Sequence, residues 1–270
     1  MPNILRRDVA PITDQAWSEL DEVATDVLKR VLTGRKVVDF SGPHGWEFPG
    51  VNLGRLKATK TKAGGIGWGV REFLPAVEIR AQFSLSQWEL DNITRGAADA
   101  DVDALEQTAA AAAKFEDDAI FNGFSQGNIE GICKAASQKA VTLPKDVEKF
   151  PQAVADAVKA MSLSGIGGPY ALVLSPDAYY TLAQSAGHGY PPRKAIDDIL
   201  AGGDVLMTDV LDGGVVLSTR GGDFELAVGQ DLSLGYESHD KSNVELFLTE
   251  SFTFRVLEPR AAVLLKKAGR

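Results

Sequence analysis

Residues 83–124, FSLSQWELDNITRGAADADVDALEQTAAAAAKFEDDAIFNGF, decide the fold. They complete a segment over 77–85 in which every second residue is apolar, as in a strand with one buried face. A short helical turn over 87–92 follows, and Arg95-Gly96 ends it. A helix of about 20 residues, roughly 30 Å long, is predicted to begin between Asp99 and Asp103, where carboxylates favour the positive end of the helix dipole.

The predicted long helix carries one apolar stripe and one acidic turn. The run of alanines over 109–113 has a high helix propensity and lets neighbouring backbone approach closely. Glu116-Asp117-Asp118 resembles a carboxylate cluster, but adjacent helix residues point about 100° apart, so the turn is expected to face solvent or another subunit. The stripe comprises Val102, Leu105, Ala109, Ala112, Phe115 and Ala119.

Composition places the chain among ordinary globular proteins of one or two domains. It has 270 residues, of which 44% are hydrophobic and 24% charged, and no apolar run is long enough to span a membrane. A single cysteine, Cys133, and an N-terminus without an apolar run favour the reducing cytoplasm. The net charge of -9 argues against bulk binding of nucleic acid.

Elements on either side of this stretch follow from local patterns. A first amphipathic helix is predicted over 13–32, and a glycine-rich segment predicts two strands, 51–60 and 66–73, which form an arm too small to be stable alone. The lobe that follows mixes helices with buried strands. It is predicted to contain helices over 151–161, 176–186 and 193–200 and strands over 170–174, 205–210 and 215–218. Alternation then indicates strands over 224–228, 244–248 and 252–256, with an apolar run over 261–265.

No motif indicates catalysis or a metal site. The three histidines, His44, His188 and His239, lie outside metal-ligand spacings, and no serine-hydrolase elbow is present. The glycines near residue 65 lack the spacing of a phosphate-binding loop. We therefore expect no catalytic residue and no metal ligand.

Several blocks together resemble one known family. They are Phe83–Asn92, Arg95-Gly96, Phe115–Asp117, Gly34–Asp39, Gly168–Tyr170, Arg220–Phe224, Gly229–Ser233 and Thr249–Phe254. Taken in order over nearly the whole chain, they resemble the encapsulins, bacterial shell proteins with the fold of tailed-phage capsids.

The resemblance implies an α+β, tailed-phage major-capsid (HK97-like) fold in three parts. Residues 1–46, 76–125 and 225–270 would form the P-domain, 47–75 the extended E-loop arm and 126–224 the A-domain. Many copies, about 60 in the smallest case, would close into an icosahedral cage by symmetry.

The family binds a C-terminal cargo peptide between the first helix and the strand near residue 234. By matched motif the peptide-binding candidates are Leu28, Val31, Arg35, Asp39, Leu232, Leu234 and Tyr236. Leu232, Leu234 and Tyr236 share one strand face that can hold alternate peptide side chains, while Asp39 can pair with a basic cargo residue. The alternative is that this strand face is simply part of the core.

Two further sites are implied by the family. The loop Gly187-His188-Gly189-Tyr190 corresponds to the fivefold pore, where a ring of His188 would charge as the pH falls toward 6; the alternative is a plain surface turn. Some encapsulins hold a flavin at the residue matching Trp88, with Arg80 as a second candidate. The alternative for Trp88 is packing in a core or interface.

The predicted function is therefore an icosahedral nanocompartment in the cytoplasm. Its cargo would be a ferritin-like protein or a dye-decolorising peroxidase, serving iron storage or defence against oxidative stress, with no nucleic acid, no membrane and no required cofactor. Two alternatives remain: a prophage major capsid protein that packages DNA, and a soluble, protease-like enzyme.

Overall fold

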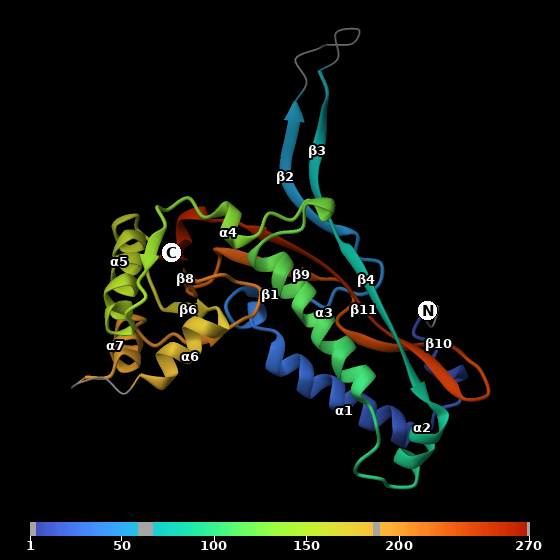
Figure 1. The fold of residues 1–270 in the computed structure, drawn as a ribbon. Coiled ribbons are helices and arrows are strands. Elements are labelled where there is room, and N and C mark those ends of the chain that lie inside the picture. Colours follow the sequence, from blue (N-terminus) through green and yellow to red (C-terminus); the bar gives the residue numbers. More distant parts are fainter. Residues whose placement is uncertain (1–3, 59–66, 186–189, 269–270) are drawn as a thin grey trace.

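The computed structural model describes residues 4–58, 67–185 and 190–268, and Figure 1 shows their arrangement. Two five-stranded sheets form the body, and a two-stranded arm projects from it. Helix and strand contribute together to both parts of the body, as the expected α+β class requires. The division into named domains stays a prediction.

The first sheet has the strand order β1-β9-β11-β10. Its fifth strand, β4, also pairs with β11 but lies outside this linear order. The two alternating stretches predicted at 244–248 and 252–256 are one continuous strand of 14 residues, β11, to which β4, β9 and β10 all pair. The bounds are β1 (Asp39–Ser41), β4 (Val77–Ser86), β9 (Phe224–Val228), β10 (Ser233–His239) and β11 (Asn243–Val256).

The arm consists of β2 (Gly50–Ala58) and β3 (Gly69–Pro75), paired antiparallel as predicted. The predicted connection at residues 63–65 lies outside the described residues. Leu56, Val70 and Phe73 are exposed large apolar side chains on the arm. Because an isolated hairpin is only marginally stable, this apolar surface fits an element that is completed by contacts beyond its own chain.

The second sheet has the order β5-β12-β8-β6-β7, and the three helices predicted for this lobe are present. Residues 262–267, which the predicted division groups with 225–270, lie between β5 and β8 in this sheet. The strands are β5 (Val141–Leu143), β6 (Tyr170–Leu174), β7 (Val205–Met207), β8 (Gly214–Ser218) and β12 (Ala262–Lys267). The helices are α4 (Ile132–Ala135), α5 (Phe150–Leu163), α6 (Pro176–Gln184) and α7 (Pro192–Ile199).

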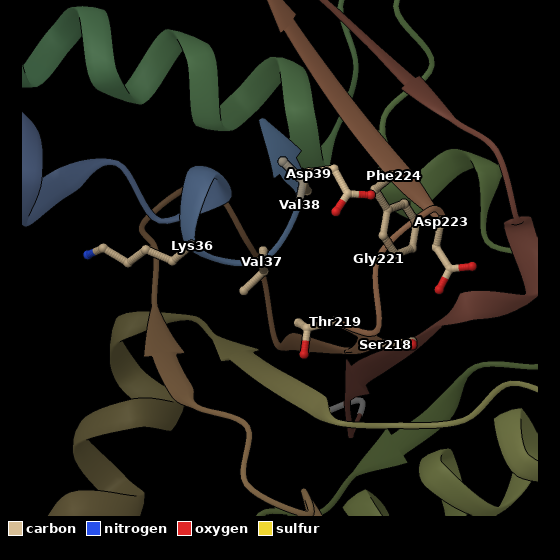
Figure 2. A pocket seen from close by; sticks show the side chains of 9 residues that line it. All are labelled: Lys36, Val37, Val38, Asp39, Ser218, Thr219, Gly221, Asp223 and Phe224. Carbon is tan, nitrogen blue, oxygen red and sulfur yellow. The ribbon is translucent and has the colours of Figure 1, made fainter. Parts of the chain in front are cut away.

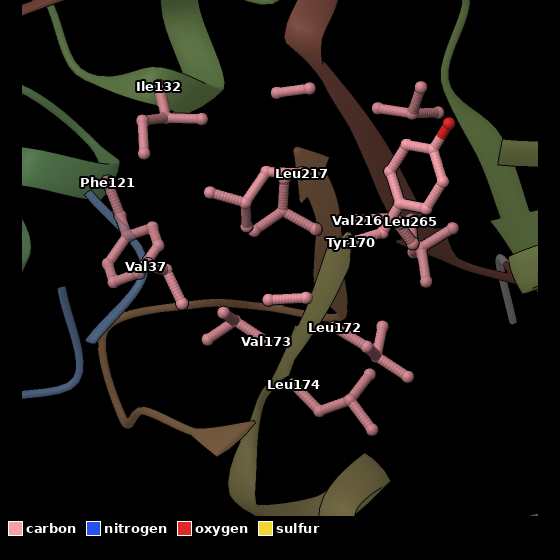
Figure 3. Packing of buried hydrophobic residues seen from close by; sticks show 14 of the residues in the cluster. Val37, Phe121, Ile132, Tyr170, Leu172, Val173, Leu174, Val216, Leu217 and Leu265 are labelled. Carbon is pink, nitrogen blue, oxygen red and sulfur yellow. The ribbon is translucent and has the colours of Figure 1, made fainter. Parts of the chain in front are cut away.

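Three helices cover the first sheet: α1 (Asp14–Val31), α2 (Gln87–Thr94) and α3 (Asp103–Phe121). The Thr13 side chain caps α1 by accepting the Ala16 N–H, as expected of an N-cap threonine. The predicted stripe of α3 packs with α1, β4 and β10, so α1 and α3 share a core. At its end α3 contributes Ile120 and Phe121 to a second core cluster, which includes the second sheet, and Figure 3 shows Phe121 in it.

The acidic turn of α3 corrects the sequence-based expectation. Glu116 is 0% exposed and Asp117 is 1% exposed, whereas a turn facing solvent or another subunit was predicted. Only Asp118 of this triplet is exposed. Buried carboxylates need partners because desolvation of an unpaired charge is costly. Their partners come from the segment directly after α1.

Candidate functional site

A groove runs between the C-terminal half of α1 and the turn that precedes β10. Its volume is about 400 Å³, and its lining is part apolar and part polar. We call the three leucines of the lining, Leu28, Leu32 and Leu232, the floor, and the polar and charged residues the rim. The rest of the lining comprises Thr25, Lys29, Arg35, Lys36 and Asp231. A groove of this composition can hold apolar side chains of an extended segment while polar groups fix its orientation.

Arg35 lines this groove and binds three carboxylates. Its Nε donates to both Glu116 oxygens at 2.9 Å, and Nη2 donates to Glu116 at 2.6 Å and to Glu250 at 2.5 Å. Its Nη1 donates to Asp231 Oδ1 at 2.9 Å. Glu116 lies on α3 and Glu250 on β11, so one guanidinium ties the helix, the sheet and the groove together.

Burial sets the protonation of this cluster. Desolvation, and then the neighbouring Glu116 charge, raise the pKa of Glu250 well above its ordinary value. Oε2 of Glu250 has no hydrogen-bond partner among the described residues, so no donor offsets the desolvation of this oxygen. For Arg35, burial lowers the pKa, but the hydrogen bond and charge of Glu116, with Glu250 and Asp231, raise it on balance, so the guanidinium stays charged.

Asp117 fixes the segment between α1 and Arg35. Its carboxylate accepts hydrogen bonds from the Thr33 N–H at 3.1 and 3.2 Å, the Gly34 N–H at 2.7 Å and the Thr208 hydroxyl at 3.0 Å. Burial raises the pKa of Asp117 to about 6, although the backbone donors at Gly34 and Thr33 oppose the rise. Adjacent carboxylates of α3 therefore position this segment: Asp117 holds its backbone and Glu116 holds the Arg35 side chain.

The predicted peptide-binding residues divide into four groups. Leu28, Arg35 and Leu232 meet in the groove. Val31 instead lines a separate hollow of about 330 Å³ between α1 and α3, together with Arg30, Lys114 and Met207. Sequence reasoning missed Leu32, Lys29 and Lys36, although the helical spacing from Leu28 to Leu32 was available as a signal.

Leu234 and Tyr236 do not reach the groove. They are 2% and 8% exposed and belong to the core shared by α1, α3 and β4. The Tyr236 N–H donates to the Leu5 carbonyl at 2.8 Å, so the N-terminal segment covers this part of β10. Leu234 and Tyr236 thus follow the alternative interpretation and face the core, whereas Leu232 precedes β10 and lines the groove.

Asp39 lies in a third, smaller hollow of about 90 Å³, shown in Figure 2. Its carboxylate accepts the Gly222 N–H at 2.6 Å and remains exposed. Lys36 lines both this hollow and the groove, and in Figure 2 its side chain extends away from the Asp39 hollow. The two sites are therefore neighbours on either side of Lys36.

The remaining predicted sites are only partly described. Gly187, His188 and Gly189 lie outside the described residues, whereas Tyr190 is exposed and its hydroxyl binds Asp198 at 2.5 Å. The Trp88 indole is 71% exposed, with the Arg95 guanidinium 5.9 Å from its ring centroid. Arg80 instead pairs with Glu237 at 3.3 Å, and its guanidinium lies 4.1 Å from the centroid of the Phe247 ring. Its side chain is thus engaged by residues other than Trp88.

Comparison with known proteins separates shared fold from shared family. A family model described as "Encapsulating protein for peroxidase" matches residues 2–253. The type 1 encapsulin shell protein of Mycolicibacterium paratuberculosis is 41% identical over 263 residues, which cover 97% of this chain and 99% of that relative. The chain belongs to the encapsulin family. The expectation that it is a shell protein and not an enzyme is confirmed.

Solved structures confirm the capsid-like fold of this encapsulin. A virus-like particle from Pyrococcus furiosus has a TM-score of 0.65 at 18% identity, covering 93% of this chain and 99% of that chain. The capsid of Myoviridae phage XM1 has a TM-score of 0.58 at 12% identity, covering 88% and 92%. Phage capsids thus share only the fold, while encapsulins share the sequence along its length. Within the described ranges, no helix of this encapsulin is long and apolar enough to cross a membrane.

Proposed function

We propose that this encapsulin captures a cargo enzyme by binding the cargo's terminal peptide in the groove between α1 and residues 231–232. The observation that carries the proposal is the apolar floor of Leu28, Leu32 and Leu232 under a polar rim. An extended peptide presents alternate side chains to one surface, so its apolar residues would occupy the floor while its backbone stays near the rim. A peptide that continues past Lys36 would reach Asp39, which is exposed and can pair with a basic residue.

The cargo is a ferritin-like protein or a dye-decolorising peroxidase, and the compartment serves iron storage or oxidative-stress defence in the cytoplasm. The peroxidase in the family description supports the second cargo class. About 60 copies would form the smallest icosahedral cage, because closed symmetry satisfies every repeated interface. Small solutes would pass through a pore lined by the loop that contains His188 and Tyr190.

A flavin at Trp88 is a separate proposal. Its support is the exposed indole, which offers a stacking surface, and the nearby Arg95 guanidinium, which can face an anionic group. Arg80 is less suited to this role because it is engaged by Glu237 and Phe247. Absorbance near 450 nm in shells purified after flavin addition, and its loss in Trp88→Ala, would test it.

The test of cargo capture begins with size-exclusion chromatography and negative-stain microscopy of the chain expressed alone. Uniform hollow spheres are expected, and a peak near the 28.8 kDa monomer would contradict self-assembly. Shells are then co-expressed with a fluorescent protein carrying the last 30 residues of a dye-decolorising peroxidase, or those of a ferritin-like protein. Fluorescence per shell measures loading, with an untagged fluorescent protein as background.

Leu232→Asp tests the groove itself. It places a charge on the apolar floor and is expected to abolish loading while shells still form, because Leu232 is only partly buried. Leu163→Asp is the matched control, since Leu163 is 79% exposed and lies outside the groove. Loading of Leu232→Asp shells at the wild-type ratio would refute the groove as the cargo site.

A further inference from the structure

The walls of the groove come from distant parts of the chain. Leu28 and Leu32 belong to the α1 side, while Leu232 belongs to the turn before β10. The contact between Arg35 and Asp231 joins these walls across 196 positions of sequence. The width of the groove therefore depends on how firmly this contact is held.

Four of the five N–H groups of Arg35 donate to carboxyl groups, and only one, on Nη1, is left for an occupant. Its Nε, Nη1 and Nη2 atoms all donate to carboxylates at 2.5 to 2.9 Å. Glu116 and Glu250, which hold two of these nitrogens, are fully buried on α3 and β11. A guanidinium held in this planar, multidentate way is fixed in direction, unlike a surface cation that can turn toward a ligand.

Asp231 carries the constraint to the opposite wall. Its Oδ1 accepts the Arg35 Nη1 at 2.9 Å and also the N–H of Leu232 at 2.8 Å. The same carboxylate oxygen thus fixes the backbone of a floor residue and binds the guanidinium. Its side chain is 39% exposed, so it can be replaced at less structural cost than either buried glutamate.

We propose that Arg35 is a positioning residue that sets the geometry of the groove through Asp231, and that it does not bind the charge of an occupant. Glu116 and Glu250 anchor Arg35 to the body. The charges that an occupant meets at the rim are Lys29 and Lys36, which form no ion pair with any described residue. This inference rests on the proposed peptide-binding function.

Asp231→Ala separates the two roles of Arg35 by the sign of its effect. If Arg35 positions the groove, loading of the tagged fluorescent protein falls about tenfold, the loss expected for one hydrogen bond to a charged group. If Arg35 were a ligand-binding cation, removing Asp231 would free its charge. A tail whose basic residues are changed to glutamine would then load better than in wild-type shells. Unchanged or increased loading overturns the inference.

Asp21→Ala is the matched control for this substitution. Asp21 lies on α1, the helix that forms the opposite wall of the groove, but does not line the groove itself. It pairs with Arg7 at 2.7 Å, and its side chain is 45% exposed. Its loading is expected to equal that of wild type. An equal fall in both variants would mean that loss of any such ion pair lowers loading, which overturns the specific role of Asp231.

Arg35 itself is tested without leaving buried charges unpaired. The triple variant Arg35→Met, Glu116→Gln and Glu250→Gln removes the guanidinium together with its two buried carboxyl partners, so the fold is expected to survive. Shells of this variant should assemble and load about as poorly as Asp231→Ala. Full loading would show that Arg35 has only a structural role within the body, which overturns the inference.

Hydrogen exchange of empty shells, followed by mass spectrometry, separates failure of this inference from failure of the proposed function. Asp231→Ala should speed exchange in peptides covering 28–36 and 229–236 and leave the second sheet unchanged. If no tail loads into wild-type shells but this exchange pattern appears, cargo binding is wrong and the positioning role stands. If exchange is unchanged, the positioning role is wrong whatever the loading.

Discussion

Asp117 makes the stability of this encapsulin depend on pH in an unusual direction. Its pKa rises from an ordinary value of 3.8 to about 6, and at 1.36 kcal/mol per pKa unit the difference corresponds to about 3 kcal/mol. No discount for solvent screening is needed because Asp117 is 1% exposed. A carboxyl group with a raised folded-state pKa contributes stability below its unfolded pKa and loses that contribution as the pH rises through about 6.

The perturbation is Asp117→Asn, which keeps the size of the side chain and removes its titration. The amide loses part of the acceptor set for Thr33 and Gly34, but that cost does not change with pH. We therefore expect the free energy of unfolding of the variant, relative to wild type, to increase by roughly 2 to 3 kcal/mol between pH 4 and pH 7.

The assay is guanidinium unfolding of shells at fixed protein concentration, followed by the fluorescence of the four tryptophans at half-unit steps from pH 4 to pH 7.5. Thr208→Val serves as a second variant. It removes a hydroxyl that donates to the carboxylate, so the transition in pH should move upward. A difference between Asp117→Asn and wild type that stays constant across this range would refute the reasoning.

Three other substitutions test the remaining packing and charge arguments. Glu250→Gln should gain stability relative to wild type as the pH rises, because the raised pKa of Glu250 means that its contribution is lost in that direction; a stability difference that stays constant with pH would contradict this. Leu234→Ala should lower unfolding stability by about 2 to 5 kcal/mol as a core truncation, and a loading defect in shells of normal melting temperature would contradict its core placement. Gly203→Ala should prevent soluble expression, because its added Cβ would lie 1.8 Å from the Tyr170 carbonyl oxygen; Gly167→Ala, with nothing within 4 Å, is the control.

Local patterns predicted the elements of this fold well. Alternation over 77–85 predicted β4, and the burial of Phe83 and Leu85 shows the expected face. The amphipathic pattern over 13–32 predicted α1. The apolar stripe of the long helix predicted the buried face of α3. These predictions succeeded because each depends on residues within a few positions of one another.

The errors concern which surface an element meets. Glu116 was expected to face solvent or another subunit. Its burial could not be predicted because its partner Arg35 is 81 positions away, and Glu250 is 215 positions from the same arginine. Periodicity correctly placed Leu234 and Tyr236 on one face but carried no information on whether the core or the groove lies there. The apolar run at 261–265 likewise contained nothing that named its neighbours, β5 and β8.

The groove was predicted in part because Arg35 and Leu232 lie in blocks that resemble the family, which binds its cargo peptide beside the first helix, where Leu28 lies. Lys29, Leu32 and Lys36 were missed, although each lies within a turn of a predicted residue. The roles inside the site were less predictable. That Arg35 binds three carboxyl groups is a property of three distant segments and becomes visible only when they are folded together.

The place of β12 determines when this protein can finish folding during translation. Residues 262–267 occupy the interior of the second sheet, so β5 and β8 have no strand between them until those residues leave the ribosome. A nascent chain from which β8 has emerged and β12 has not therefore leaves the β8 edge that faces β12 unpaired, and such edges are prone to pairing with other chains. The risk of wrong pairing between copies of the chain is confined to this interval, and insertion of β12 between β5 and β8 ends it.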